Sequence, residues 1–139
     1  MRKNFLSSKR LYLMIAGICI IAIIVFAVAK NNTLSANDKI ALEFIEDFAY
    51  EFKDPSSVRL VSGTVDFPDD LPCLWCGLSA TNGFGARTTS YYFFRTYGNG
   101  TVGVTESSYG LTNPSYTEKD KLNIDLINKK LEQIFGSYE

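Results

Sequence analysis

The most pronounced pattern along the chain is an uninterrupted apolar segment near its start. Residues 11–29 (LYLMIAGICIIAIIVFAVA) contain no charged side chain, and a helix of that length extends about 28 Å, close to the hydrocarbon thickness of a bilayer. The segment is preceded by four basic residues and no acid: Arg2, Lys3, Lys9 and Arg10. Because basic residues remain on the cytoplasmic side, this pattern predicts a single-pass cell-membrane protein. Residues 1–10 then form a basic cytoplasmic segment, residues 11–29 a transmembrane anchor, and the C-terminal domain lies outside.

A cleaved signal is the alternative fate of the same segment. Ala27, Val28 and Ala29 form a small-x-small triplet of the kind that signal peptidase cuts, so secretion after cleavage following Ala29 is the second prediction. The apolar run is longer than the usual signal core of about 7–15 residues, which favours a retained anchor or uncleaved signal. Both interpretations use residues 30–34 as a short linker and place the rest of the chain outside the cytoplasm.

Two segments with helical periodicity flank the remainder of the chain. The first is expected to begin at Ser35, with Asp38 as an acid in its first turn, and to end before Pro55. Its apolar positions are Ile40, Phe44, Ile45, Phe48, Ala49 and Phe52. The second is expected to begin at Thr117 with Asp120 and to stop at Gly136. Its apolar stripe consists of Ile124, Ile127, Leu131, Ile134 and Phe135.

Four segments with the composition of β-strands lie between these helices: residues 58–65, 73–81, 88–97 and 101–107. In the second of them alternate residues are apolar, as in a half-buried strand: Leu74, Cys76, Leu78 and Ala80. Consecutive strands with short loops predict an antiparallel meander with both helices on one face. The predicted fold class is therefore α+β, with an N-terminal transmembrane helix, then a helix, a four-stranded antiparallel meander and a C-terminal helix. Residues 35–139 form the extracytoplasmic domain.

Charge and composition narrow the classes of partner and of chemistry. Residues 30–139 carry 10 basic and 15 acidic residues, a net charge of −5. Nucleic acids are bound by clustered Lys and Arg, so this balance argues against a nucleic-acid partner. The chain has no histidine, which excludes Ser-His-Asp and Cys-His catalysis and any zinc site built with imidazole. No catalytic residue, metal ligand or cofactor is assigned.

Two short motifs have the letters of ligand sites but fit structural roles better. Asp66, Asp69 and Asp70 lie in a proline-flanked loop without the spaced oxygen ligands and glycine of a calcium loop, so a solvated turn is favoured. Residues 98–103 (GNGTVG) match the dinucleotide-binding pattern G-x-G-x-x-G, but strand-like sequence follows where that site needs a helix. The Asn-Gly pair of this segment instead predicts a type I′ hairpin turn, since both residues tolerate positive φ.

The third β-rich segment carries aromatic side chains on both of its faces. One face is expected to pack under the helices, while the other meets solvent or binds a partner. Tyr91, Phe93 and Tyr97 are the candidate residues of this contact patch. Aromatic residues favour strands in any case, so cross-strand aromatic pairs that only stabilise the sheet are the alternative, and the more favoured one.

Cys73 and Cys76, in the stretch PCLWCG, form the one local motif for an enzymatic reaction, a thiol–disulfide centre. Residues three apart in a strand lie about 10 Å apart and point to opposite faces, whereas a disulfide needs Cα atoms within about 7 Å. The two thiols can bond only if the chain curls into a turn before the strand. A redox centre also needs a thiol at a helix N-terminus, and strand-like sequence follows here. A local disulfide and two reduced, buried thiols both remain open.

The middle of the chain also contains an ordered set of short motifs. A helix ending in EFKDPSS is followed by a strand and by WCGLSATNGFGARTTSYYFF. This arrangement resembles an uncharacterised family of small bacterial secreted or membrane-anchored domains, in which a Lys-Asp-Pro-x-Ser helix end precedes a Cys-Gly, an Asn and a glycine-rich strand region. The matching residues are Lys53, Asp54, Pro55, Ser57, Cys76, Gly77, Asn82, Gly83 and Gly85. The resemblance covers about residues 40–97 and implies location and fold but no activity, and Cys73 departs from its pattern.

These patterns together predict a membrane-anchored extracytoplasmic domain that binds without catalysing a reaction. Residues 11–29 would give it the membrane as one partner, and an envelope protein or a small ligand would be the other. The alternative function is that of a thiol–disulfide redox protein that uses Cys73 and Cys76.

Overall fold

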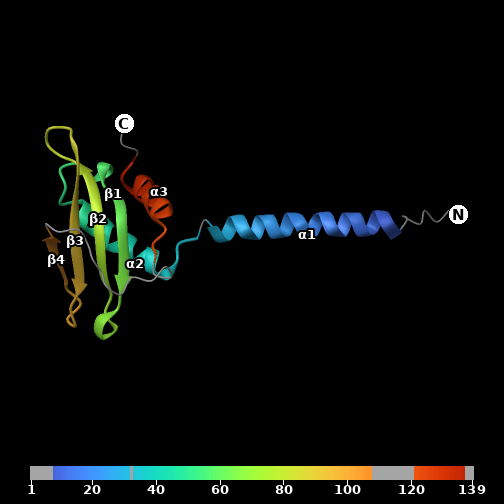
Figure 1. Ribbon diagram of the computed structural model, residues 1–139, viewed down its shortest axis with the longest axis horizontal. Coiled ribbons are helices and arrows are strands. Elements are labelled where there is room, and N and C mark those ends of the chain that lie inside the picture. The colour runs from blue at the N-terminus through green and yellow to red at the C-terminus, as the bar shows by residue number, and fades with distance from the viewer. Residues whose placement is uncertain (1–7, 32, 108–120, 137–139) are drawn as a thin grey trace. The chain divides into compact units, whose positions relative to one another are not determined.

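The computed structural model describes residues 8–31, 33–107 and 121–136 of the chain. The chain divides into two compact units, Met1–Thr33 and Leu34–Glu139. The described part of the first unit is a single helix, α1 (Ser8–Asn31). The second unit holds the sheet and two further helices (Figure 1).

The predicted transmembrane anchor is the part of the fold class that the structure contradicts. Within residues 8–31, 33–107 and 121–136, no helix has the length and apolar character needed to cross a membrane. The anchor predicted over residues 11–29 and the single-pass cell-membrane location are overturned by this finding. The corrected fold class is α+β, with three helices and a four-stranded antiparallel sheet.

The sheet of the second unit is an antiparallel meander, as the spacing of the β-rich segments predicts. Its strands are β1 (Arg59–Asp66), β2 (Cys73–Thr81), β3 (Arg87–Thr96) and β4 (Val102–Ser107), and they lie side by side in chain order. The register places Leu74 opposite Phe94 and Phe94 opposite Val104. β1 and β4 are thus the two edge strands of the sheet.

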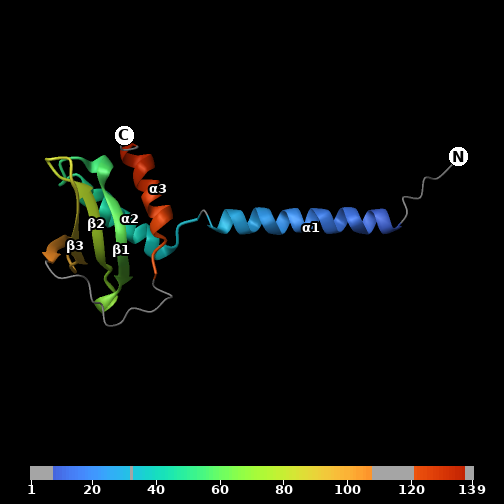
Figure 2. The same cartoon turned by 45° about the horizontal axis from the view of Figure 1, so that its top comes forward.

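Two helices pack on one face of this sheet, α2 (Ala36–Ala49) and α3 (Ile124–Phe135) (Figures 1 and 2). α2 begins where the sequence predicts, because Ser35 and Asp38 form a reciprocal capping box. It ends at Ala49, one turn earlier than predicted, and a 3₁₀ turn, η1 (Pro55–Ser57), precedes β1. A second 3₁₀ turn, η2 (Pro68–Asp70), lies between β1 and β2.

The start of α3 differs from the predicted start at Thr117 and Asp120, two residues that lie outside the described part of the chain. The structure begins the helix at Ile124, with the side chain of Asn123 accepting a hydrogen bond from the Leu126 N–H at 3.1 Å. Lys121 forms a β-bridge with Thr64 of β1 instead of entering the helix. A tertiary contact with the sheet therefore sets the helix start.

The core lies between the sheet and the two helices. All four alternate apolar residues predicted for β2 are buried in it, which confirms the period-two pattern of that strand. β3 contributes its even-numbered aromatic residues to the same core, and the helices contribute the remainder of the buried apolar surface. The principal members are Ala41, Ile45, Ala49, Val58, Leu60, Leu74, Cys76, Leu78, Tyr92, Phe94, Ile127 and Leu131.

The turn between β3 and β4 is a three-residue hairpin turn that a glycine closes. The Gly100 N–H donates to the Tyr97 carbonyl at 2.8 Å, and the Tyr97 N–H donates to the Thr101 carbonyl at 2.9 Å. Gly100 has a φ of +81°, whereas Asn99 has no positive φ. The predicted type I′ turn needs positive φ at both residues of the Asn-Gly pair, so this prediction is wrong. The β2–β3 turn has the same form around Gly85, whose φ is also +81°.

The two edge strands of the sheet differ in the partners that their outer backbone groups have. On β1, the side chain of Asn128 accepts from the Leu60 N–H at 2.7 Å and donates to the Leu60 carbonyl at 2.9 Å. The bridge between Lys121 and Thr64 occupies a second position on the same edge. On β4, residues 102–106 have β3 as their sole strand neighbour in the described chain. Within the described residues, the β1 edge therefore has partners at Leu60 and Thr64, whereas residues 102–106 of β4 have no strand on their outer side.

Candidate functional site

The two cysteines of PCLWCG both lie within β2, which begins at Cys73. Cys76 is part of the core between sheet and helices, whereas Cys73 is buried outside that core, on the strand face of opposite parity. Both are free thiols. Residues three apart in a strand point to opposite faces, so this geometry separates the pair and gives no support to a shared redox function.

Burial also holds both β2 thiols in their protonated form. It raises the pKa of Cys73, with the nearby Asp66 carboxylate as a second cause, and it raises the pKa of Cys76 strongly. Thiolate is the nucleophilic form of cysteine, so both groups are poorly reactive. Because each folded pKa lies above the unfolded value of about 8.5, the stabilisation from burying these thiols is complete below about pH 8.5 and is lost as pH rises beyond it.

Slow reaction of both β2 thiols is the first expected result. In a Cys19→Ala background, which removes the exposed thiol of α1, we expect DTNB at pH 8 to modify Cys73 and Cys76 about 100-fold more slowly in native protein than in urea. The reason is that reaction requires an opening of the sheet that costs about 3 kcal/mol or more. Absorbance of the released thiolate measures the rate, and a fast native reaction by either residue would restore the redox interpretation.

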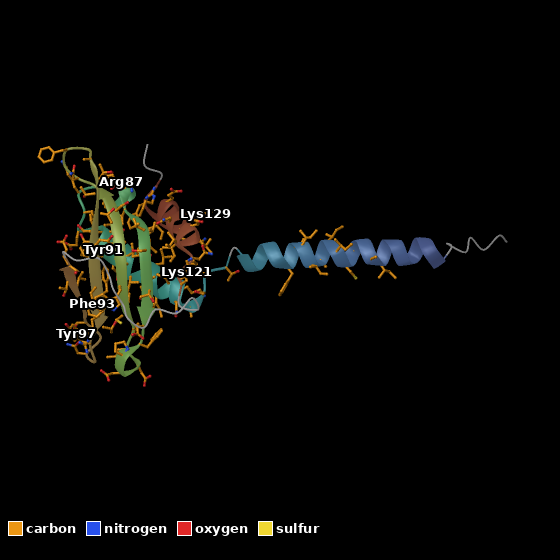
Figure 3. The ribbon with its side chains drawn as sticks, in the orientation of Figure 1. Arg87, Tyr91, Phe93, Tyr97, Lys121 and Lys129 are labelled. Carbon is orange, nitrogen blue, oxygen red and sulfur yellow. The ribbon has the colours of Figure 1, made fainter. Side chains whose placement is uncertain are left out.

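The sheet face without helices carries the predicted contact patch (Figure 3). Phe93 stands opposite Trp75 in the register, and their rings stack with centroids 3.9 Å apart and an interplanar angle of 25°. Each side chain is half-buried. The ring surface that a ligand would contact is thus partly taken by a neighbour within the sheet, as in a cross-strand pair.

Tyr91 and Tyr97 lie over glycines of the neighbouring strands. A Cβ atom added to Gly77 would meet the Tyr91 ring at 3.0 Å, and one added to Gly103 would meet the Tyr97 ring at 2.8 Å. These rings therefore fill the space that the missing side chains leave. The contacts account for the tyrosines and glycines as sheet packing, and the patch function of Tyr91, Phe93 and Tyr97 stays a prediction.

A hollow on the helix side of the sheet lies between α2 and β4, and we call it the α2–β4 groove. Its volume is about 190 Å³. It is lined by Phe44, Asp47, Phe48, Glu51, Phe94, Val102 and Val104. Pockets that enclose a whole small molecule measure about 300–1,000 Å³, so this groove accommodates one or two side chains rather than a cofactor.

The floor of the α2–β4 groove is aromatic and rigid. Phe94 is 1% exposed and stacks on Phe44, with ring centroids 5.7 Å apart. The ring of Phe48 meets Phe94 edge-on at 5.2 Å. The wall on the β4 side is open to solvent, because Val102 is 48% exposed and Val104 is 40% exposed.

The rim on the α2 side of the groove is acidic. Asp47, in the last turn of α2, and Glu51, two residues beyond the end of the helix, are both exposed. Within the described residues the one salt bridge joins Arg59 to Glu132, at 3.1 Å, so neither rim carboxylate has a cationic partner there. Figure 3 places Lys121 and Lys129 on the α3 side of the sheet, away from β4.

Sequence reasoning did not identify this groove. The acidic face of α2 and the two valines of β4 were visible as separate patterns, but their meeting depends on where α2 crosses the sheet. The usable signal was in β4, where Val102 and Val104 alternate with small polar residues at an edge position.

The residues that carry the family resemblance have structural functions in this chain. The Asp54 side chain accepts from the Ser56 N–H at 3.0 Å and caps η1. The buried Ser57 hydroxyl donates to the Asp54 carbonyl at 2.8 Å and accepts from the Thr81 N–H at 3.0 Å. The Asn82 side chain accepts from two N–H groups of its own turn. These contacts join the end of α2 to the β2–β3 hairpin.

The acidic loop between β1 and β2 does not gather metal ligands. Asp69 and Asp70 adopt positive φ values of 56° and 61° within η2, and Asp66 accepts a hydrogen bond from the adjacent Phe67 N–H. Across the described ranges, no group of three or more acidic or cysteine side chains is arranged to hold a metal ion. Asp66 is the exposed last residue of β1, and Asp69 and Asp70 are exposed residues of η2.

Comparison with known proteins adds no relative to this description. No protein-family model, no curated protein and no solved structure matches the chain.

Proposed function

We propose that the second unit of the chain is a non-catalytic binding module whose binding site is the α2–β4 groove. The single observation that carries this proposal is an apolar hollow with a packed aromatic floor and two half-exposed valines at its wall. A rigid, preformed floor binds without an ordering cost, which favours recognition of a partner side chain.

The groove supports binding better than the aromatic face does. On the aromatic face, Trp75 and Phe93 already stack on each other. In the groove, Val102 and Val104 are 48% and 40% exposed, so a ligand that buries them removes apolar surface from water at about 25 cal/mol per Å². The small volume indicates that the ligand is a segment of a partner protein that inserts one or two side chains.

Methyl NMR with indole, a probe of side-chain size, tests this proposal. In protein labelled on the valine methyl groups, we expect millimolar indole to shift the resonances of Val102 and Val104. Val61, which is 48% exposed on β1 and does not line the groove, provides the matched control and should not shift. The reason is that a fragment of this size gains affinity from a concave apolar surface and not from an exposed side chain on a convex one.

A Val104→Asp variant completes the test. The added carboxylate places an unpaired charge beside the apolar floor, so indole shifts at Val102 should disappear. Equal shifts at Val61 and in the groove, or shifts that persist in the variant, would show that indole reports only general surface contact, and the groove would then not be the binding site.

A further inference from the structure

We propose that the occupant of the α2–β4 groove is an extended, cationic segment of another protein that adds to the outer edge of β4 as a fifth strand. This inference rests on the proposed function and specifies its partner. Three features of the described structure carry it: an open strand edge, a side-chain hollow beside that edge, and an acidic rim without cations.

The edge supplies backbone hydrogen bonds. Residues 102–106 of β4 pair with β3 on one side, and no described residue pairs with them on the other. Exposed edge strands are usually protected by lysine, proline, a bulge or a covering element, since they otherwise pair with another chain. The β4 segment VGVTE contains no lysine, proline or bulge, and Glu106 is its one charged residue. An added strand is the partner that satisfies such an edge.

The groove supplies a place for alternate side chains of the added strand. Val102 and Val104 line the groove, so the helix side of β4 is the side on which the groove opens. A residue of a fifth strand directly opposite Val104 would place its Cβ about 4.5–5.5 Å away, and its second neighbours would lie on the same face. Alternate residues of the partner therefore point into the groove, and an apolar one reaches the exposed valines.

The rim selects for positive charge on that same face. Asp47 lies in the last turn of α2, and Glu51 lies in the turn that follows the helix, where its N–H donates to the Phe48 carbonyl at 3.0 Å. Four residues of helical turn correspond to about 6 Å along the axis. Residues two apart on an extended strand are separated by about 6.8 Å, so lysines at alternate positions match the spacing of the two carboxylates. The two carboxylates are also like charges on one rim, an arrangement that a cationic partner relieves.

The same rim argues against a second copy of the chain as the occupant. If β4 paired with β4 of a second copy, the acidic rims of both copies would lie at the same interface. Within the described residues the one ion pair joins Arg59 to Glu132, and Figure 3 places Lys121 and Lys129 on the α3 side, so no cation is paired with either rim carboxylate there. A basic partner gains from this charge, whereas a copy is repelled by it.

Designed peptides provide the probe. The test peptide is Thr-Val-Thr-Lys-Thr-Lys-Thr-Val-Thr, in which the two lysines are two residues apart and share one face of a strand with the valines. One control peptide replaces lysine with glutamate, and a second has the same composition with its lysines moved to the threonine face. By calorimetry at low salt, we expect both controls to bind at least about tenfold more weakly than the test peptide.

Charge reversal in the protein locates the contact. Glu51→Lys should lower the affinity of the protein for the test peptide about tenfold and raise its affinity for the glutamate peptide. Asp125→Lys makes the same change of charge at an exposed site on α3 and should alter neither affinity by more than about twofold. Equal loss in the two variants would show that the net charge alone attracts the peptide, and the inference would be wrong.

Backbone pairing is tested separately. Methylating the amide nitrogens of the peptide on the β4-facing side should abolish binding, and the bound peptide should slow hydrogen exchange of the outward β4 amides. If indole occupies the groove but the test peptide does not bind, the fifth-strand inference fails while the proposed function stands. If neither binds, both fail. Sedimentation of the protein without peptide tests the remaining occupant. If the protein forms a dimer that Val104→Lys dissociates, the occupant is a second copy and the inference is wrong.

Discussion

Replacing Phe94 by alanine is expected to lower the free energy of unfolding by about 3–5 kcal/mol. The side chain is 1% exposed at the centre of the sheet, opposite Leu74 and Val104 in the register. It also carries the aromatic contacts with Phe44 and Phe48. Removing it leaves a cavity among groups held by two strands and a helix, so the surroundings have little freedom to collapse.

Phe84 is the matched control for this substitution. It lies at the tip of the β2–β3 hairpin and is 98% exposed, so Phe84→Ala should change the free energy of unfolding by no more than about 0.5 kcal/mol. Urea unfolding followed by circular dichroism measures both variants. Similar losses in the two would mean that Phe94 does not occupy the core position described above.

Replacing Asp38 by alanine is expected to cost about 2–4 kcal/mol, although the residue is on the first turn of a helix. One carboxylate oxygen accepts from the Ser35 N–H at 2.9 Å, and the other accepts from the Asn123 N–H at 2.8 Å. Asp38 is 4% exposed, so both donors lose their acceptor in a buried place. The loss combines a helix cap with a charged hydrogen bond between α2 and the start of α3.

Two further variants separate these contributions. Asp38→Asn keeps one acceptor oxygen, so it should lose about half as much stability as Asp38→Ala. Asp47→Ala removes a carboxylate from the same helix at an exposed position and should change stability by less than about 0.5 kcal/mol. Urea midpoints and slopes provide the comparison, and an Asp38→Ala loss no larger than that of Asp47→Ala would remove the proposed link between α2 and α3.

The parts of the fold that follow from the sequence are those with a local cause. The alternation of Leu74, Cys76, Leu78 and Ala80 identifies a strand and its buried face, because side chains of a strand alternate with period two. The start of α2 is equally local, since Ser35 and Asp38 cap it through each other. Chain order then suffices to arrange the four strands as a meander.

The parts that were missed have tertiary causes. The start of α3 follows from the bridge between Lys121 and Thr64, which no pattern around Thr117 reveals. The α2–β4 groove depends on where α2 crosses the sheet, so its lining residues could not be assembled from periodicity. The patch function of Tyr91, Phe93 and Tyr97 stays a prediction, and the contacts of the two tyrosines with glycines of the neighbouring strands depend on the strand register.

The unequal edges of the sheet also determine how far an assembly can grow. Asn128 presents its amide to Leu60 much as a neighbouring strand would, and so terminates the sheet at β1. A strand that joins β4 therefore extends the sheet at one end only, and the opposite end offers no backbone position at Leu60 for a further chain. Complexes of this unit should therefore have a one-to-one stoichiometry and should not polymerise, because the Asn128 side chain occupies the backbone position that a further strand would need.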